Sequence, residues 1–239
     1  MRLAIIGNSH TACLLHAIRD GGWAQPGLDI IFFAAIGQNL DQLRRSGDRL
    51  VPKSKALADS IRTTSGGLED LVPADFDAFL LVGLGYNVPP VDRRLSQAVQ
   101  QGVNVNTVKG SLAWRIAGMV RELSAGPILV QHSPLRAGDT GPQHDEMLAK
   151  AVSYDRLIDR AETVWAELGA RVVRQPVQTR YRDILSARSF SRGSRGLRGA
   201  GLAHQDTDRS HMNAAFGEIM LTEVAGMLAS MPASGPGRA

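Results

Sequence analysis

The chain has 239 residues, 44% of them hydrophobic and 21% charged, and its formal net charge is +4. This length and composition suit one α/β domain with a substantial core, which we place at residues 1–231. The longest apolar runs, such as 79–84, are far below the roughly 20 residues that cross a bilayer, so no membrane span is predicted. A single cysteine, Cys13, excludes a disulfide framework.

The N-terminus lacks the features of a secretory signal. Its apolar stretch, residues 3–6, is too brief for a signal-peptide core and has no small-residue cleavage site after it. Together with the single cysteine, this predicts a cytoplasmic protein.

Five segments rich in Ile, Val, Leu and Phe recur along the chain and alternate with stretches of helical periodicity, as in a parallel sheet built from βαβ units. The predicted strands are 2–6, 28–34, 77–83, 127–131 and 170–174. The predicted helices are 10–20, 54–63, 93–102, 109–123 and 143–168, followed by a last amphipathic helix that contains Met220 and Val224. The tail, 232–239, is rich in Pro, Gly and Ser and is predicted to be flexible.

Two predicted connections are unusually long. Residues 35–53 and 175–207 both begin at the carboxyl end of a strand, the edge where open α/β sheets bind ligands. The second is rich in Gly and Ser between 186 and 200, which predicts a mobile loop. Seven arginines gather near it, at positions 180, 182, 188, 192, 195, 198 and 209.

This local basicity predicts contact with an anion. Nucleic acid is one candidate, but no nucleic-acid-binding module can be recognised, so we predict no nucleic-acid partner. We assign Arg192, Arg195 and Arg198 to the binding of an acidic or strongly polar substrate, with solvated loop charges as the alternative.

Gly7-Asn8-Ser9-His10 follows the first strand and precedes the first helix. A serine at this corner faces the crevice beyond the sheet, together with the first amides of the helix. Such a serine can be a nucleophile, and the alternative is a helix N-cap. His10 fits the first helical turn better than the role of a base.

The candidate base lies near the other end of the chain, in Asp208-Arg209-Ser210-His211. An Asp three residues before a His can bond one imidazole nitrogen and leave the other for the nucleophile. Asp206 is an alternative orienting residue.

These blocks resemble those of the SGNH (GDSL-type) hydrolase superfamily. Gly7-Asn8-Ser9 stands where that family usually has Gly-Asp-Ser, and Gly85-Tyr86-Asn87 matches its G-x-N block. Gly37 fits the single glycine after the second strand, and Asp208 with His211 matches the last block. The resemblance implies a three-layer α/β/α sandwich with a five-stranded parallel sheet, the flavodoxin-like fold of this family.

The resemblance also implies the roles of the site residues. Ser9 would be the nucleophile, His211 the base and Asp208 its orienting residue. The oxyanion hole would consist of the amides of Ser9 and Gly37 with the side chain of Asn87, whose alternative is a turn residue.

The sequence departs from the family pattern at three positions. Asn8 replaces the usual Asp, Met212 stands where Pro is frequent, and Gly217 comes one residue late. These departures indicate a divergent member.

Two further residues are predicted at the substrate-binding edge. Gly85 belongs to the block that carries Asn87, and His132 closes the fourth strand. No metal site is predicted, because His144, Asp145 and Glu146 are consecutive helix positions that face different directions. No nucleotide cofactor is predicted either, since neither a G-x-G-x-x-G pattern nor a P-loop occurs.

The sequence therefore predicts a serine esterase that removes an O-acyl group, most readily acetyl, from a carbohydrate or another small polar ester through an acyl-enzyme on Ser9. The alternatives are an O-acyltransferase with the same triad, acting in polysaccharide or natural-product assembly, and a non-catalytic binding module on a degenerate hydrolase fold. The oligomeric state is left open.

Overall fold

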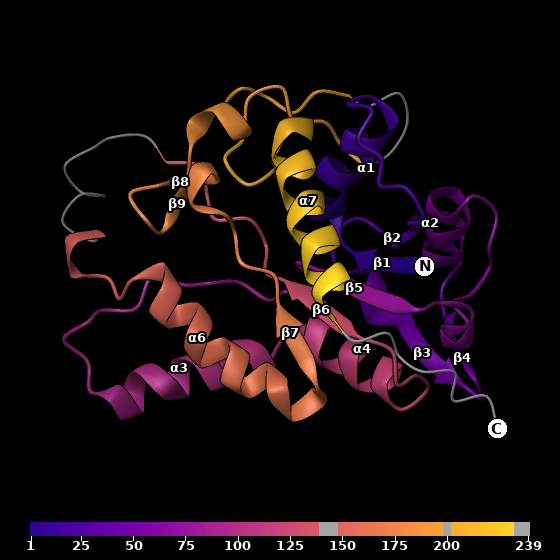
Figure 1. The fold of residues 1–239 in the computed structure, drawn as a ribbon, viewed down its shortest axis with the longest axis horizontal. Helices are drawn as coiled ribbons and strands as arrows, with labels where there is room; N and C mark the ends of the chain where they lie inside the picture. Colours follow the sequence, from indigo (N-terminus) through magenta and orange to yellow (C-terminus); the bar gives the residue numbers. More distant parts are fainter. Residues whose placement is uncertain (139–147, 198–201, 232–239) are drawn as a thin grey trace.

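The computed structural model describes residues 1–138, 148–197 and 202–231. A five-stranded, all-parallel sheet crosses the molecule in the order β2-β1-β5-β6-β7 (Figure 1). These strands are Arg2–Gly7 (β1), Asp29–Ala34 (β2), Ala78–Val82 (β5), Ile128–Gln131 (β6) and Ala170–Val172 (β7). The order is that of flavodoxin-like doubly wound folds, and the predicted α/β fold with five parallel strands is confirmed.

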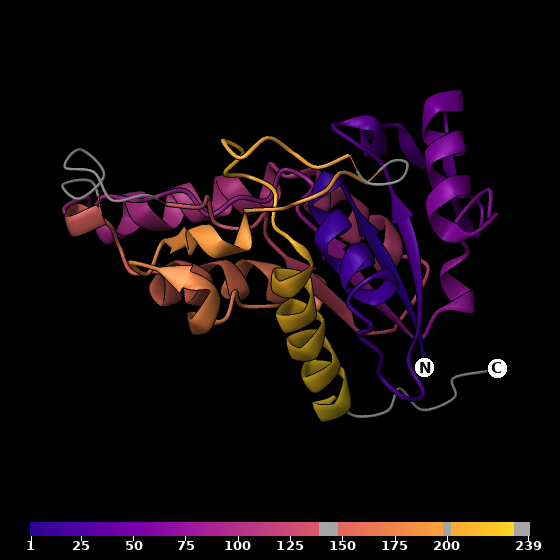
Figure 2. The same cartoon turned by 90° about the horizontal axis from the view of Figure 1, so that it is seen from above.

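Helices cover both faces of the sheet (Figures 1 and 2). The described α-helices are Ala12–Arg19 (α1), Lys55–Ser65 (α2), Gln97–Lys109 (α3), Leu112–Arg121 (α4), Tyr154–Trp165 (α6) and Ala214–Ser230 (α7). In β1, Leu3 and Ile5 pack in the core under α1 and α7, whereas Ala4 and Ile6 pack in the core under α2, α4 and α6. Because both faces are covered, β1 is apolar throughout and does not alternate with polar residues.

The packing of α7 on α1 brings the two ends of the chain together. A Cβ on Gly217 would lie only 2.1 Å from the carbonyl oxygen of Cys13, so these helices touch backbone to backbone. The loop before α7, which carries His211, therefore lies at the N-terminal end of α1, next to Ser9.

The predicted helix 143–168 is interrupted: residues 148–150 are helical, residues 151–153 are not, and a second helix, α6, follows. The α6 helix begins only at Tyr154, because Ala151 pairs in extended conformation with Asp92 and Val152 donates its amide to the carbonyl of Val91. Residues 139–147 lie outside the described part.

The two long connections contain regular structure. A hairpin of Leu43–Ser46 (β3) and Arg49–Pro52 (β4) occupies 35–53, with Leu43 and Leu50 buried in the core. A second, short hairpin of Arg180–Tyr181 (β8) and Leu185–Ser186 (β9) lies within 175–207.

Among the residues that the structure describes, no helix is both long enough and apolar enough to cross a membrane.

Candidate active site

Ser9 lies just beyond the carboxyl end of β1, where a 3-10 turn, Ser9–Thr11, leads into α1. Asn8 caps this turn: its Oδ1 accepts the amide of His10 at 3.2 Å, and its carbonyl accepts the amide of Thr11. The alternative role of Ser9, that of a helix cap, is thus filled by Asn8, and the Ser9 hydroxyl is left for another contact.

The Ser9 hydroxyl contacts the ring of His211. Its Nε2 lies 3.0 Å from Ser9 Oγ, across 202 residues of sequence. Its Nδ1 lies 2.8 Å from Asp208 Oδ2. An ionised carboxylate only accepts hydrogen bonds, so Nδ1 carries the proton and Nε2 can accept the Ser9 hydroxyl proton. The three side chains thus form the hydrogen-bonded chain that nucleophilic serine catalysis requires.

Asp208, and not Asp206, is the carboxylate that contacts His211. Its Oδ1 also accepts the amides of Ser210 at 2.7 Å and His211 at 2.9 Å. Burial raises the pKa of Asp208, but the hydrogen bonds from the His211 ring and from these two amides outweigh burial and bring the pKa to about 2. Asp208 is therefore ionised at any pH near neutrality and holds the His211 ring in one orientation.

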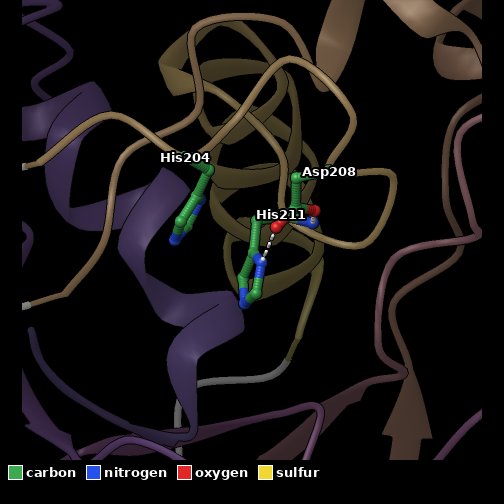
Figure 3. A group of neighbouring side chains, drawn as sticks. All are labelled: His204, Asp208 and His211. Carbon is green, nitrogen blue, oxygen red and sulfur yellow. Dashed lines mark hydrogen bonds and ion pairs between the residues drawn. The ribbon is translucent and has the colours of Figure 1, made fainter.

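Two further histidines, which the sequence did not single out as site partners, flank His211. The His204 ring lies beside it, with ring centroids 4.2 Å apart (Figure 3), and its Nδ1 contacts Ser194 Oγ at 3.2 Å. The His10 ring is also close, with ring centroids 5.4 Å apart. Burial, and then repulsion from His211, lower the pKa of both, that of His10 to about 4. Both neighbouring rings are therefore neutral near pH 7 and place no positive charge beside His211.

His204, Asp208 and His211 also present a possible metal-binding group. Each offers one ligand atom, and the three atoms lie within 4.8 Å of one another (Figure 3). Both ring nitrogens of His211 already contact Asp208 and Ser9, so a metal ion could bind only by displacing one of these contacts. The absence of a metal requirement stays a prediction. His144, Asp145 and Glu146 lie outside the described residues.

The predicted oxyanion donors gather at the edge of the sheet where Ser9 lies. Gly7 pairs with Ala34 at the end of β2 and with Val82 at the end of β5, so the loops that carry Gly37 and Asn87 both start beside the Ser9 turn. Gly37 occupies an exposed turn with a φ of 62°. The exposed Asn87 donates one hydrogen from Nδ2 to the carbonyl of Gly85 at 3.2 Å, which leaves its second N–H for a ligand.

His132 is not a surface ligand for substrate. Its side chain is buried, with 1% exposure, and its Nδ1 donates to the carbonyl of Ser133 at 2.6 Å. Its Nε2 accepts the Tyr154 hydroxyl at 2.8 Å, and that hydroxyl in turn accepts the amide of Gln175. The prediction that His132 binds substrate is wrong, because the ring points into the core beneath the strand ends.

The arginine prediction is also corrected. Arg195 forms an ion pair with Asp20 at the far end of α1. Arg192 lines a separate cavity together with His16 of α1 and Ala214 of α7. Arg198 lies outside the described residues.

Within the predicted mobile loop, 186–200, the described residues 186–197 are held by buried serines, and residues 198–200 lie outside the described part. Ser186, Ser191 and Ser194 are buried and hydrogen-bonded. Their hydroxyls contact the side chains of Gln175, Arg188 and His204, which fixes these small residues in place.

His132→Ala should therefore affect stability and spare substrate affinity. Removing the ring leaves the Tyr154 hydroxyl without its acceptor, which should lower the free energy of unfolding by about 1–3 kcal/mol, in addition to the cost of the cavity. Urea unfolding and the KM for a small ester would be measured together. A raised KM at unchanged stability would restore the substrate-binding role.

Stability should also decline in mild acid. Burial lowers the pKa of His132 and of His10 to about 4, from an unfolded value of 6.5. Between these values the unfolded chain binds protons that the folded chain does not. The contribution of these two histidines to stability is therefore fully present above pH 6.5 and is lost progressively as the pH falls to 4. Urea unfolding at pH 7, 5.5 and 4.5 should give a decreasing free energy of unfolding. A flat profile over this range would mean that neither histidine is held neutral.

No protein-family model and no curated protein matches the chain. Its structure is similar to that of a protein described as "a putative SGNH hydrolase from Slackia heliotrinireducens", with a TM-score of 0.47 and 14% sequence identity over 95% of this chain and 98% of that chain.

Proposed function

We propose that this protein is a serine esterase of the SGNH type, with Ser9 as nucleophile, His211 as general base and Asp208 as the residue that orients His211. The observation that carries the proposal is the hydrogen-bonded chain from Ser9 Oγ to His211 Nε2 at 3.0 Å and from His211 Nδ1 to Asp208 at 2.8 Å. The arrangement of the sequence blocks supports it, since Gly7-Asn8-Ser9, Gly85-Tyr86-Asn87 and Asp208 with His211 come from three separate parts of the chain to one region.

In the first step His211 Nε2 takes the hydroxyl proton of Ser9 while Oγ forms a bond to the carbonyl carbon of the ester. Negative charge develops on the carbonyl oxygen. The amides of Ser9 and Gly37 and the free N–H of Asn87 are the proposed donors to that oxygen. The tetrahedral intermediate collapses when the bond to the leaving alcohol breaks and His211 gives that oxygen its proton.

The second step releases the acyl group. His211 takes a proton from water, the hydroxide oxygen bonds to the acyl carbon, and the bond to Ser9 Oγ breaks as His211 returns the proton to Ser9. The ionised Asp208 stabilises the imidazolium that forms in both steps. Carboxylic acid and free enzyme are the products.

The proposed substrate is an O-acyl ester, with acetyl as the first acyl group to test and a carbohydrate or other small polar alcohol as the leaving group. The experiment follows hydrolysis of 4-nitrophenyl acetate and of an acetylated sugar. Free acetate without any added acceptor supports the esterase. Ester consumption that requires a sugar acceptor and yields an acylated sugar would favour an O-acyltransferase, and no consumption of any ester would favour a binding module.

A further inference from the structure

A cavity of about 410 Å³ is lined in part by the immediate sequence neighbours of Ser9 and His211. Three of its lining residues are neighbours of the site: His10 follows Ser9, Ser210 precedes His211, and Asn87 is the proposed oxyanion donor. The cavity is therefore placed to hold the part of a substrate next to the scissile ester.

Most of the remaining wall is apolar. Val88 and Pro90 lie in the loop after β5, Pro134 lies in the loop after β6, and Ile184 and Leu185 come from the β8–β9 hairpin. Such walls bind hydrocarbon.

Arg136 is the exception in this lining. Among the residues that the structure describes, its guanidinium takes part in no ion pair and no side-chain hydrogen bond. Two arginines of the neighbouring 175–207 segment are engaged: Arg180 pairs with Asp183, and Arg195 pairs with Asp20. His10 adds no charge at neutral pH, because burial and repulsion from His211 lower its pKa to about 4.

A guanidinium stays ionised at every pH at which the enzyme would work, and its planar fork matches carboxylate, phosphate and sulfate groups. Next to apolar walls, the Arg136 guanidinium, which has no ion-pair partner among the described residues, gives an anionic ligand a charge-assisted contact that a neutral ligand cannot make.

We propose that this cavity makes the enzyme selective for esters that carry an anionic group, which Arg136 binds while the apolar walls hold the linking carbons. The inference rests on the proposed esterase function. It assigns to Arg136 the role that the sequence had suggested for Arg192, Arg195 and Arg198.

The anion can belong to the acyl group or to the alcohol, and two pairs of esters separate these cases. For the acyl side, mono-4-nitrophenyl adipate is compared with 4-nitrophenyl hexanoate. For the alcohol side, 4-acetoxybenzoate is compared with its methyl ester. Within each pair the anionic and neutral esters have the same scissile bond.

The wild-type enzyme should show the higher kcat/KM for the anionic member of at least one pair. Arg136→Gln should reduce that preference about 10-fold or more and leave the neutral ester unaffected. Arg171→Gln, a control at an exposed position on β7, should leave the preference unchanged. Thermal unfolding of both variants checks that they fold.

The inference would be overturned if the wild-type enzyme showed no higher kcat/KM for the anionic ester in either pair. It would also be overturned if Arg136→Gln and Arg171→Gln changed the preference equally. Either result would leave the esterase proposal standing. Failure to hydrolyse any of the four esters would overturn the esterase proposal and this inference with it.

Discussion

Ser9→Ala should lower kcat for 4-nitrophenyl acetate by at least about 10³-fold, because the variant lacks the hydroxyl oxygen that His211 Nε2 contacts and that is the proposed nucleophile. The protein should still fold. The side chain of Asn8, and not that of Ser9, caps the turn into α1, so the substitution removes no capping bond.

Ser230→Ala, at the exposed end of α7, is a matched control and should retain full activity. Kinetics and thermal unfolding would be measured on both variants. Unchanged turnover in Ser9→Ala would remove Ser9 from the mechanism, and a lost unfolding transition would give Ser9 a structural role instead.

Asp208→Asn should lower kcat by roughly 10³- to 10⁴-fold with little change in the fold. The amide oxygen of Asn can still accept the amides of Ser210 and His211, which Asp208 accepts now. Its NH₂ group, however, favours the imidazole tautomer that carries the proton on Nε2, and this nitrogen could then no longer accept the Ser9 proton.

Asp206→Asn is the control for this prediction. Asp206 is the alternative orienting residue in the sequence, but His211 Nδ1 bonds to Asp208. The Asp206 variant should keep near wild-type activity. A large loss in Asp206→Asn with an active Asp208→Asn would reverse the assignment and mean that the loop before α7 rearranges during catalysis.

The sequence was sufficient to predict the central sheet. Each of the five strands is an apolar run between turn signals, and burial on both faces requires such runs regardless of the rest of the fold. The errors fall where structure depends on distant partners. The start of α6 at Tyr154 follows from the pairing of Ala151 with Asp92, a contact that no local periodicity records.

The structure of the two long connections also depends on distant partners that the local sequence does not show. Residues 43–52 form a hairpin because Leu43 and Leu50 are buried against the core, which the sequence shows only as two leucines among charged residues. Ser186 looks like a loop residue in the sequence, but it is buried and bonds to Gln175 and to the carbonyl of Leu135.

In the candidate site, the sequence predicted that Ser9, Asp208 and His211 would meet, because each belongs to a short block with characteristic spacing. It could not predict the direction of a single side chain. His132 turns inward to Tyr154, 22 residues away, and His204 stacks on His211 without any local motif to indicate it. Arg136 is distinguished by its place in the cavity beside Asn87, which is a property of the folded protein.

The most direct test of the central claim is to label the wild-type protein with a fluorophosphonate and locate the adduct by peptide mass spectrometry. We expect one phosphonyl group per chain, on the peptide that contains Ser9, and no labelling of Ser9→Ala or of heat-unfolded protein. Stoichiometric labelling of another residue would contradict the assignment of Ser9 as the nucleophile. The assignment would also be contradicted if the protein hydrolysed esters but was not labelled.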